Sequence, residues 1–148
     1  NCFGYDDPFK YKKIINEKNL KNIILNPFRK NIYKEIVKFD LLCHLSRREG
    51  LPVSVLETMC LGVPVICFDI RGNNDLIKNN FNGFLVKPYN LTIFKKKIFQ
   101  ILTNNSNIET IKKNISKTIS PKHKIEIVNK EFTNFIIQAC KNWFLKNS

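Results

Sequence analysis

Apolar residues along this chain follow two patterns, short continuous runs and longer helical repeats. The runs at 40–45, 63–68 and 84–86 predict buried strands, because each is short and is bounded by turn-forming or polar residues. At 91–102 and 108–119, apolar residues recur at helical spacing, which predicts amphipathic helices. The chain is therefore expected to mix strands with helices.

The segments between the predicted strands favour further helices. Because Pro is favoured at the first helical position and Gly just past the last, the segment 52–61 predicts a helix. Alternating strands and helices indicate an α/β fold, a Rossmann-like parallel sheet with helices on both faces. We also expect helices at 6–19, 32–38 and 74–78, a short strand at 23–25 and a terminal helix at about 123–144.

A predicted strand, a tight loop and a helix start follow one another around Gly50 and Pro52. In open α/β sheets such a junction presents free backbone N–H groups to phosphate. Those of Val53 and Ser54 are the candidates, since Pro52 cannot donate. Glu57 lies five residues beyond Pro52, about 7.5 Å along the helix axis at about 1.5 Å per residue. A diphosphate at the helix start would place an attached ribose near this carboxylate, so the geometry suits a nucleotide sugar.

The run at 47–57 holds two carboxylates, Glu49 and Glu57, that lie eight positions apart. This run resembles the Glu-x7-Glu signature of the retaining glycosyltransferases of family 4, which have the two-domain GT-B fold. Further blocks follow the order of that family at 26–32, 69–77 and 82–86. The resemblance covers roughly residues 3–102 and is closest to members that build capsular, exopolysaccharide or lipopolysaccharide chains.

The resemblance implies a role for each of the two carboxylates. Glu49 would be the catalytic residue, placed near the donor sugar and its anomeric centre, where it orients hydroxyls or stabilises developing positive charge. Glu57 would bind the ribose hydroxyls, since an ionised carboxylate accepts two hydrogen bonds from a vicinal diol. The alternatives are an ion pair of Glu49 with Arg47 or Arg48, and a solvated position for Glu57 on the helix surface.

The same resemblance implies the remaining donor-binding residues. The loop against the sugar would be shaped by Gly50, Leu51 and Pro52. Phe28 would lie beside the base, with Pro27 in place of the usual Gly of the family. Arg71 follows a predicted strand and would reach the donor phosphate or the acceptor. The alternative interpretations are a core aromatic for Phe28 and an exposed loop residue for Arg71.

The family has an acceptor-binding N-terminal domain, and neither this domain nor the start of the second domain is recognisable in these 148 residues. We therefore interpret the chain as a fragment. Residues 1–120 would form a partial nucleotide-sugar-binding domain of the GT-B type. Residues 121–148 would form a C-terminal helix that packs on this domain or on the missing one.

The chain carries a net charge of +13, from 25 basic and 12 acidic residues. Lysines at 95–97 and 112–113 favour contact with an anionic membrane surface, where a lipid-linked acceptor would be found. Compositional drift over the whole chain is the alternative interpretation. Nucleic acid is not an expected partner, because no recognition motif accompanies the charge. Without a spanning apolar stretch or a signal sequence, we expect a cytoplasmic protein that is peripheral on the inner face of the membrane.

Cysteine and histidine usage indicates neither disulfides nor a metal site. The five cysteines show no paired spacing, and Cys43, Cys60 and Cys67 lie in apolar surroundings, which predicts reduced core thiols. His44 is expected to be a satisfied core or sheet-end histidine. With two histidines far apart in the chain, no metal ligand set is predicted. No cofactor is expected, because the helix dipole would partly replace a metal at the leaving nucleotide.

These observations predict the donor-binding domain of a glycosyltransferase that transfers a sugar from a UDP-sugar to a growing surface glycan. The isolated chain is expected to be inactive, because half of the cleft would be absent. One alternative is a non-catalytic, degenerate GT-B half that acts as an interaction module. Another is a sugar-nucleotide epimerase of the same fold, which would need an acid–base set that the sequence does not show.

Overall fold

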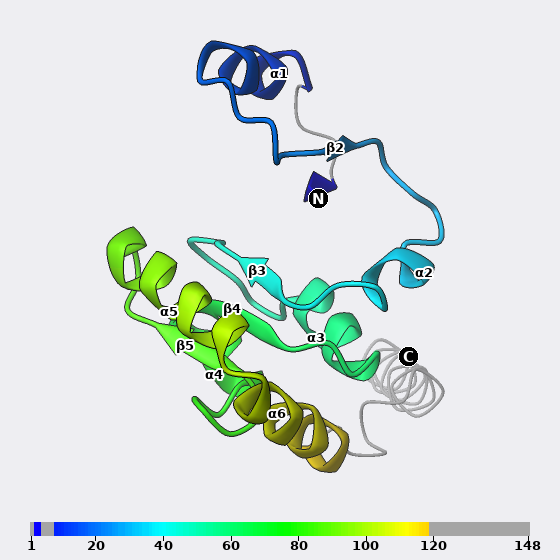
Figure 1. Ribbon diagram of the computed structural model, residues 1–148. Helices are drawn as coiled ribbons and strands as arrows, with labels where there is room; N and C mark the ends of the chain where they lie inside the picture. The colour runs from blue at the N-terminus through cyan, green and yellow to red at the C-terminus, as the bar shows by residue number, and fades with distance from the viewer. Residues whose placement is uncertain (1, 4–7, 119–148) are drawn as a thin grey trace, which may run out of the picture. The chain divides into compact units, whose positions relative to one another are not determined.

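The computed structural model describes residues 2–3 and 8–118 (Figure 1). The chain divides into two compact units, with the boundary between Glu35 and Ile36. The predicted terminal helix at 123–144, and with it the proposed division at residue 121, lies outside the described residues. Each unit is described by itself below.

The first unit holds a two-stranded parallel sheet and one longer helix. Strand β1 (Cys2–Phe3) pairs with β2 (Leu25–Asn26), and α1 (Pro8–Glu17) lies between them in sequence. The predicted helix at 6–19 is confirmed. The predicted strand at 23–25 is shifted toward its end, and β1 was not predicted, because strands of two residues leave no periodic signal.

The second unit contains the main sheet, and its strands run parallel in the order β3-β4-β5. Strand β3 (Leu42–His44) pairs with β4 (Val65–Phe68), which pairs on its other side with β5 (Phe84–Val86). The short helix α2 (Tyr33–Ile36) precedes β3 and crosses the boundary between the units. The three predicted strands of this region and the α/β fold class are confirmed, with the strands shorter than their apolar runs.

Helices flank this sheet and complete its core. They are α3 (Val53–Cys60), α4 (Asn73–Leu76), α5 (Leu91–Thr103) and α6 (Asn105–Thr118). All four residues of β4 are buried, because this central strand has a neighbour on each side. Each of the three longer helices adds two buried side chains to the cluster: Val55, Met59, Phe94, Ile101, Ile111 and Ile115. The gap between the helical repeats predicted at 91–102 and 108–119 is reduced to Asn104, since α5 ends at Thr103 and α6 begins at Asn105.

The prediction for the cysteines is wrong for two of the three. Cys67 is buried in β4, whereas Cys43 and Cys60 are exposed, and all three are free thiols. Cys43 is the middle residue of β3, so alternation along the strand turns its side chain away from the face used by Leu42 and His44. Cys60 is the last residue of α3, where the apolar sequence run continues past the buried helix face.

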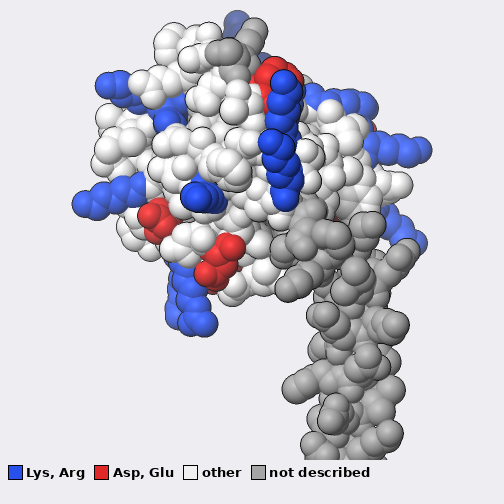
Figure 2. Space-filling model, turned by 90° about the horizontal axis from the view of Figure 1, so that it is seen from below, with Lys and Arg blue, Asp and Glu red and all other residues white. Residues whose placement is uncertain are grey.

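Basic side chains are spread over the surface that Figure 2 shows, with few acidic side chains among them. Within the predicted basic run, Lys97 already has contacts. Its Nζ donates to Asn80 Oδ1 at 3.0 Å and lies 5.3 Å from the centre of the Phe84 ring. Lys95 and Lys96 are exposed on α5. Among the described helices, none is long and apolar enough to cross a membrane.

Candidate functional site

The predicted site residues of the second unit lie in loops at the carboxyl ends of its strands. Because β3, β4 and β5 are parallel, the loops that follow them leave the same edge of the sheet. These loops are 45–52, 69–72 and 87–90. In open α/β sheets ligands bind in the crevice at this edge. The candidate site therefore consists of these three loops and the start of α3.

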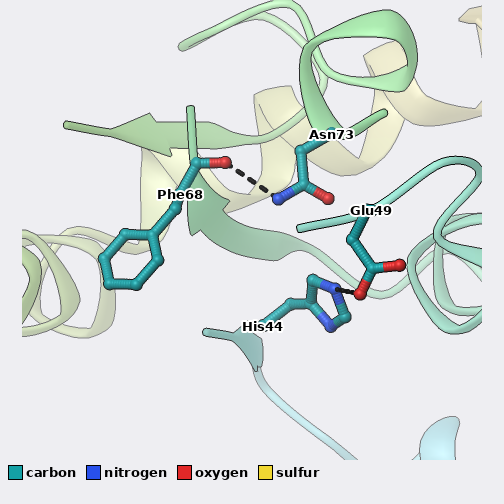
Figure 3. A network of polar contacts seen from close by, with 4 residues as sticks. All are labelled: His44, Glu49, Phe68 and Asn73. Carbon is teal, nitrogen blue, oxygen red and sulfur yellow. Dashed lines mark hydrogen bonds and ion pairs between the residues drawn. The ribbon is translucent and has the colours of Figure 1, made fainter. Parts of the chain in front are cut away.

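Glu49 is held by His44, the last residue of β3 (Figure 3). His44 Nε2 lies 3.0 Å from Glu49 Oε1, and the two side chains are only 16% and 23% exposed. Among the described residues, this histidine is the side-chain hydrogen-bond partner of Glu49, in place of Arg47 or Arg48. The prediction of a satisfied sheet-end histidine is confirmed, although the sequence analysis did not name Glu49 as its partner. Its position five residues before Glu49, at the end of a strand, was the available signal.

The start of α3 presents the backbone N–H groups of Val53 and Ser54. The next two N–H groups are already bonded, since the carbonyl of Pro52, which precedes the helix, accepts from Val55 at 3.0 Å and from Leu56 at 3.1 Å. No described residue accepts a hydrogen bond from the N–H of Val53 or Ser54. The side chains of both residues are exposed. The N–H groups assigned to the diphosphate from the sequence are thus open to a ligand on this side of the helix.

Glu57 lies on the same helix, about 6 Å along the axis from Val53 at about 1.5 Å per residue. Its side chain is half-buried, which differs from the alternative of a fully solvated surface Glu. Burial, followed by the charge of Glu57, raises the pKa of the Cys60 thiol. Of the loop residues before the helix, Pro52 is buried, whereas Gly50 and Leu51 are exposed.

The loop after β4 packs directly on the backbone of the Glu49 loop. Gly72 has φ +86, and a Cβ added to it would lie 2.7 Å from the carbonyl oxygen of Gly50 and 3.1 Å from that of Glu49. The next residue, Asn73, is fully buried and donates through Nδ2 to the carbonyl of Phe68 at 2.8 Å (Figure 3). This bond ties the loop to the end of β4. Sequence analysis included both residues in a family block but assigned neither a role.

A third contact joins the loops after β3 and β5. The guanidinium carbon of Arg47 lies 5.7 Å from the centre of the Tyr89 ring, a cation–π contact. Tyr89 also lies 5.9 Å from the ring of Phe68 and has φ +63. Left-handed backbone is uncommon for a bulky residue, so the packing around this ring holds the turn in place. Sequence analysis did not single out Tyr89.

The remaining predicted site residues, Arg71 and Phe28, are both exposed but belong to different compact units. Arg71 is exposed in the loop after β4, and no described residue pairs with its side chain. It remains available to a ligand, as does any exposed loop Arg. Phe28 belongs to the first unit, whereas all the other predicted site residues belong to the second. Its side chain is 55% exposed, which does not fit the alternative of a core aromatic.

The comparison with known families decides the identity of this arrangement. The profile of the family described as Glycosyl transferases group 1 matches residues 3–118. The chain belongs to the group 1 glycosyltransferases. The match includes the loops after β3, β4 and β5 and the whole of α3, so the candidate site lies within the family region.

Two relatives of this group 1 glycosyltransferase chain are named glycosyltransferases of bacteria. The poly(ribitol-phosphate) alpha-N-acetylglucosaminyltransferase of Staphylococcus aureus (strain COL) is 35% identical over 98 residues, which are 65% of this chain and 20% of that protein. The UDP-Gal:alpha-D-GlcNAc-diphosphoundecaprenol alpha-1,3-galactosyltransferase of Escherichia coli is 31% identical over 96 residues, 65% of this chain and 24% of that protein. The chain therefore spans about a quarter or less of these relatives.

A solved structure shows the same fold. A variant of TarM from S. aureus, crystallised with fondaparinux, alpha-GlcNAc-glycerol and UDP, aligns with a TM-score of 0.79 and 29% identity. The alignment covers 89% of this chain and 27% of that one. The fold of this group 1 glycosyltransferase chain is therefore that of a GT-B glycosyltransferase domain.

The titratable groups of the described residues form no cluster that fits a metal ion. No three His, Cys, Asp or Glu side chains of residues 2–3 and 8–118 come together as ligands. The carboxyl edge carries the carboxylate of Glu49, which is bonded to His44, and the open N–H groups of Val53 and Ser54. The carboxylate of Glu57 follows one helical turn after Val53. This set can accept hydroxyl hydrogen bonds and donate to an anion.

Proposed function

We propose that this chain is the donor-binding domain of a retaining glycosyltransferase that uses a UDP-sugar and extends a surface glycan. The observation that carries the proposal is the order of groups along α3. Two open N–H groups stand at the helix start, and Glu57 follows within about 6 Å at about 1.5 Å per residue. This order matches a diphosphate followed by a ribose.

The diphosphate would accept hydrogen bonds from the N–H groups of Val53 and Ser54. The positive end of the helix dipole points at the same place and favours the negative charge that builds up on the leaving nucleotide. The proposed reaction therefore needs no metal ion or other cofactor at this position. Glu57 would accept hydrogen bonds from the ribose hydroxyls, with Arg71 near the phosphates or the acceptor.

Glu49 would act at the donor sugar. Its side chain is 23% exposed and belongs to the loop at the carboxyl edge of the sheet. An ionised carboxylate there would orient sugar hydroxyls and stabilise the positive charge of an oxocarbenium-like transition state. Gly50, Leu51 and Pro52 would border the sugar, and Phe28 would lie beside the base.

The names of the relatives support a UDP-linked donor and a bacterial glycan as acceptor. One relative carries UDP-Gal and a lipid-diphosphate acceptor in its name, and the TarM structure contains UDP. We propose that transfer also requires a second, acceptor-binding domain, because the relatives are four to five times as long as the aligned segment. The chain alone would then bind the donor without transferring the sugar.

Calorimetric titration of the folded chain with UDP tests this proposal, with ADP and GDP as competing nucleotides. We expect saturable binding that prefers UDP. Replacing the carboxylate in Glu57→Gln should weaken UDP binding at least about tenfold, because a hydrogen bond to a charged group contributes roughly 1.5–3 kcal/mol. Glu109→Gln, an exposed carboxylate on α6, is the matched control and should bind UDP as the parent chain does.

The outcomes separate the hypotheses. Equal UDP affinity in the parent chain and Glu57→Gln would contradict the assignment of Glu57 to the ribose. Preference for ADP or GDP would keep a transferase but change its donor. A folded chain that binds none of the three nucleotides would favour the non-catalytic interaction module.

A further inference from the structure

We propose that His44 is a positioning residue for Glu49, which holds one carboxylate oxygen and leaves the other for the donor sugar. The inference rests on the proposed function, because it takes Glu49 to be the residue that faces the sugar. His44 itself would touch neither the sugar nor the nucleotide. It would act through the orientation of the Glu49 carboxylate.

The pair has the geometry of a fixed contact. His44 Nε2 and Glu49 Oε1 are 3.0 Å apart, and both side chains are more than three-quarters buried. Partial burial lowers the screening by water, so this hydrogen bond is stronger than one on an open surface. An ionised carboxylate only accepts hydrogen bonds, so Nε2 must carry the proton and donate.

His44 lies in the main sheet of the second unit. It is the last residue of β3 and is in register with Cys67, a fully buried residue of the central strand β4. Glu49, by contrast, lies in a loop, where a long side chain would otherwise sample several rotamers. A contact from the strand to the loop therefore removes freedom from the carboxylate before the donor arrives, which is the requirement for a preorganised site.

The backbone of Glu49 is fixed independently of its side chain. Gly72 lies so close to the carbonyls of Glu49 and Gly50 that no Cβ fits between them. The buried Asn73, bonded to the carbonyl of Phe68 at 2.8 Å, keeps this glycine in place. The loop after β4 thus holds the main chain of Glu49, and His44 is left to set the direction of the carboxylate (Figure 3).

One oxygen of the carboxylate remains open. Oε1 is used by His44, whereas Oε2 has no hydrogen-bond partner among the described residues and points away from the imidazole in Figure 3. A sugar hydroxyl can donate to Oε2 without breaking the bond to His44. The arrangement predicts that loss of His44 weakens binding of the sugar. Binding of the nucleotide, which depends on α3, should not change.

The test compares binding of UDP with binding of UDP-glucose, UDP-galactose and UDP-N-acetylglucosamine by the whole chain. His44→Leu removes the donor, and His44→Gln places an amide N–H near the position of Nε2. Cys43→Ala, on the opposite face of the same strand, is the matched control. For the sugar nucleotide that the parent chain prefers, His44→Leu should lose about tenfold in affinity and His44→Gln should restore most of it.

Binding of UDP should change less than about twofold in all these variants, a change of under roughly 0.4 kcal/mol. A purely structural role would weaken UDP and the sugar nucleotides alike in His44→Leu, and that result would overturn the proposal. Failure of His44→Gln to restore sugar-nucleotide binding would overturn it as well. If the parent chain binds no nucleotide, the proposed function fails, and the contact is judged by a measurement that needs no ligand.

That measurement is the ¹⁵N spectrum of the two histidines. We expect His44 to hold its proton on Nε2 and expect the Nε2 signal to move in Glu49→Gln. The sequence holds one other histidine, His123, and the spectrum of His44→Leu assigns the two signals. An unchanged His44 signal in Glu49→Gln would show that the pair does not exist in solution and would reject the proposal independently of ligand binding.

Discussion

At the scale of single residues, a glycine and a histidine do most to shape the candidate site. Gly72 lets two loops approach each other closely, and His44 makes the only side-chain hydrogen bond to Glu49 that the described residues show. Neither residue belongs to the Glu-x7-Glu run at 47–57. Both act on the position of Glu49, one through its main chain and one through its carboxylate.

Gly72→Ala should destabilise the second unit by about 2–4 kcal/mol, measured by chemical denaturation. Two costs add: a left-handed backbone for a residue with a Cβ, and a clash of that Cβ with the carbonyl of Gly50 at 2.7 Å. Gly62→Ala separates them, because Gly62 has φ +76 but open space around its Cβ position. This control should cost about 1–2 kcal/mol. Equal losses in both variants would show that the two loops are not in close contact.

At the scale of elements, β4 organises the unit. It is the central strand of its sheet, it is buried along its whole length, and the loop that follows it supports Glu49. Helix α3 contributes both to the core and to the candidate site, since its buried face packs on the sheet while its start lies at the carboxyl edge. The core and the candidate site are therefore built from the same two elements.

The burial of β4 also predicts how stability depends on pH. Burial, with a smaller contribution from the charge of Asp69, raises the pKa of the Cys67 thiol from 9.0 to about 12. The folded chain therefore keeps the thiol protonated where the unfolded chain ionises it. The contribution of this thiol to the free energy of unfolding is complete below pH 9. It is lost as the pH rises toward 12, by about 1.4 kcal/mol for each pH unit.

We expect the loss of stability that the Cys67 thiol causes above pH 9 to be absent in Cys67→Ala. The difference in free energy of unfolding between the parent chain and the variant, followed from pH 8 to about pH 10.5 by urea denaturation, isolates the thiol from lysines and tyrosines that titrate in both. Cys60→Ala is the control, since this thiol is exposed and should give a smaller slope. A constant difference for Cys67→Ala would mean that the thiol is not held protonated in the folded chain.

At the scale of the whole molecule, net charge and family membership both bear on contact with an anionic membrane surface. The net charge of +13 comes mainly from lysines, and the relatives include an enzyme whose named acceptor is a diphosphoundecaprenol lipid. Lys97 and Lys112 already have partners in Asn80 and Glu109. Lys95 and Lys96 are exposed on α5, so any attraction of this helix to an anionic surface would rest mainly on these two side chains.

We expect the chain to bind vesicles that contain phosphatidylglycerol and to be released by salt. The double variant Lys95→Gln with Lys96→Gln should lower vesicle binding about tenfold or more, at roughly 1 kcal/mol for each lysine near the surface. Lys10→Gln with Lys12→Gln removes the same charge from α1 and is the control. If both double variants lose binding equally, the attraction is due to net charge, as compositional drift implies. Sedimentation with vesicles measures each case.

Local patterns were sufficient for much of the fold. The strands β4 and β5 and the helices α3 and α5 follow from apolar runs, helical spacing, Pro52 and Gly62, because these signals act over a few neighbouring residues. The same local order along 47–57 also placed Glu57 and the open N–H groups on one helix. Two-residue strands and the side-chain burial of Cys43 and Cys60 could not be predicted, since they depend on which elements pack together.

The contacts around Glu49 depended on the folded arrangement. Arg47, Arg48 and His44 all lie within five residues of Glu49, and sequence offered the two arginines as partners. The fold selects His44, because the turn after β3 returns Glu49 to the end of that strand. Gly72 and Tyr89 reach the same edge from β4 and β5, which are separated in sequence and brought together by parallel pairing. Periodicity describes each element alone, whereas the contacts between loops exist only once the strands are aligned.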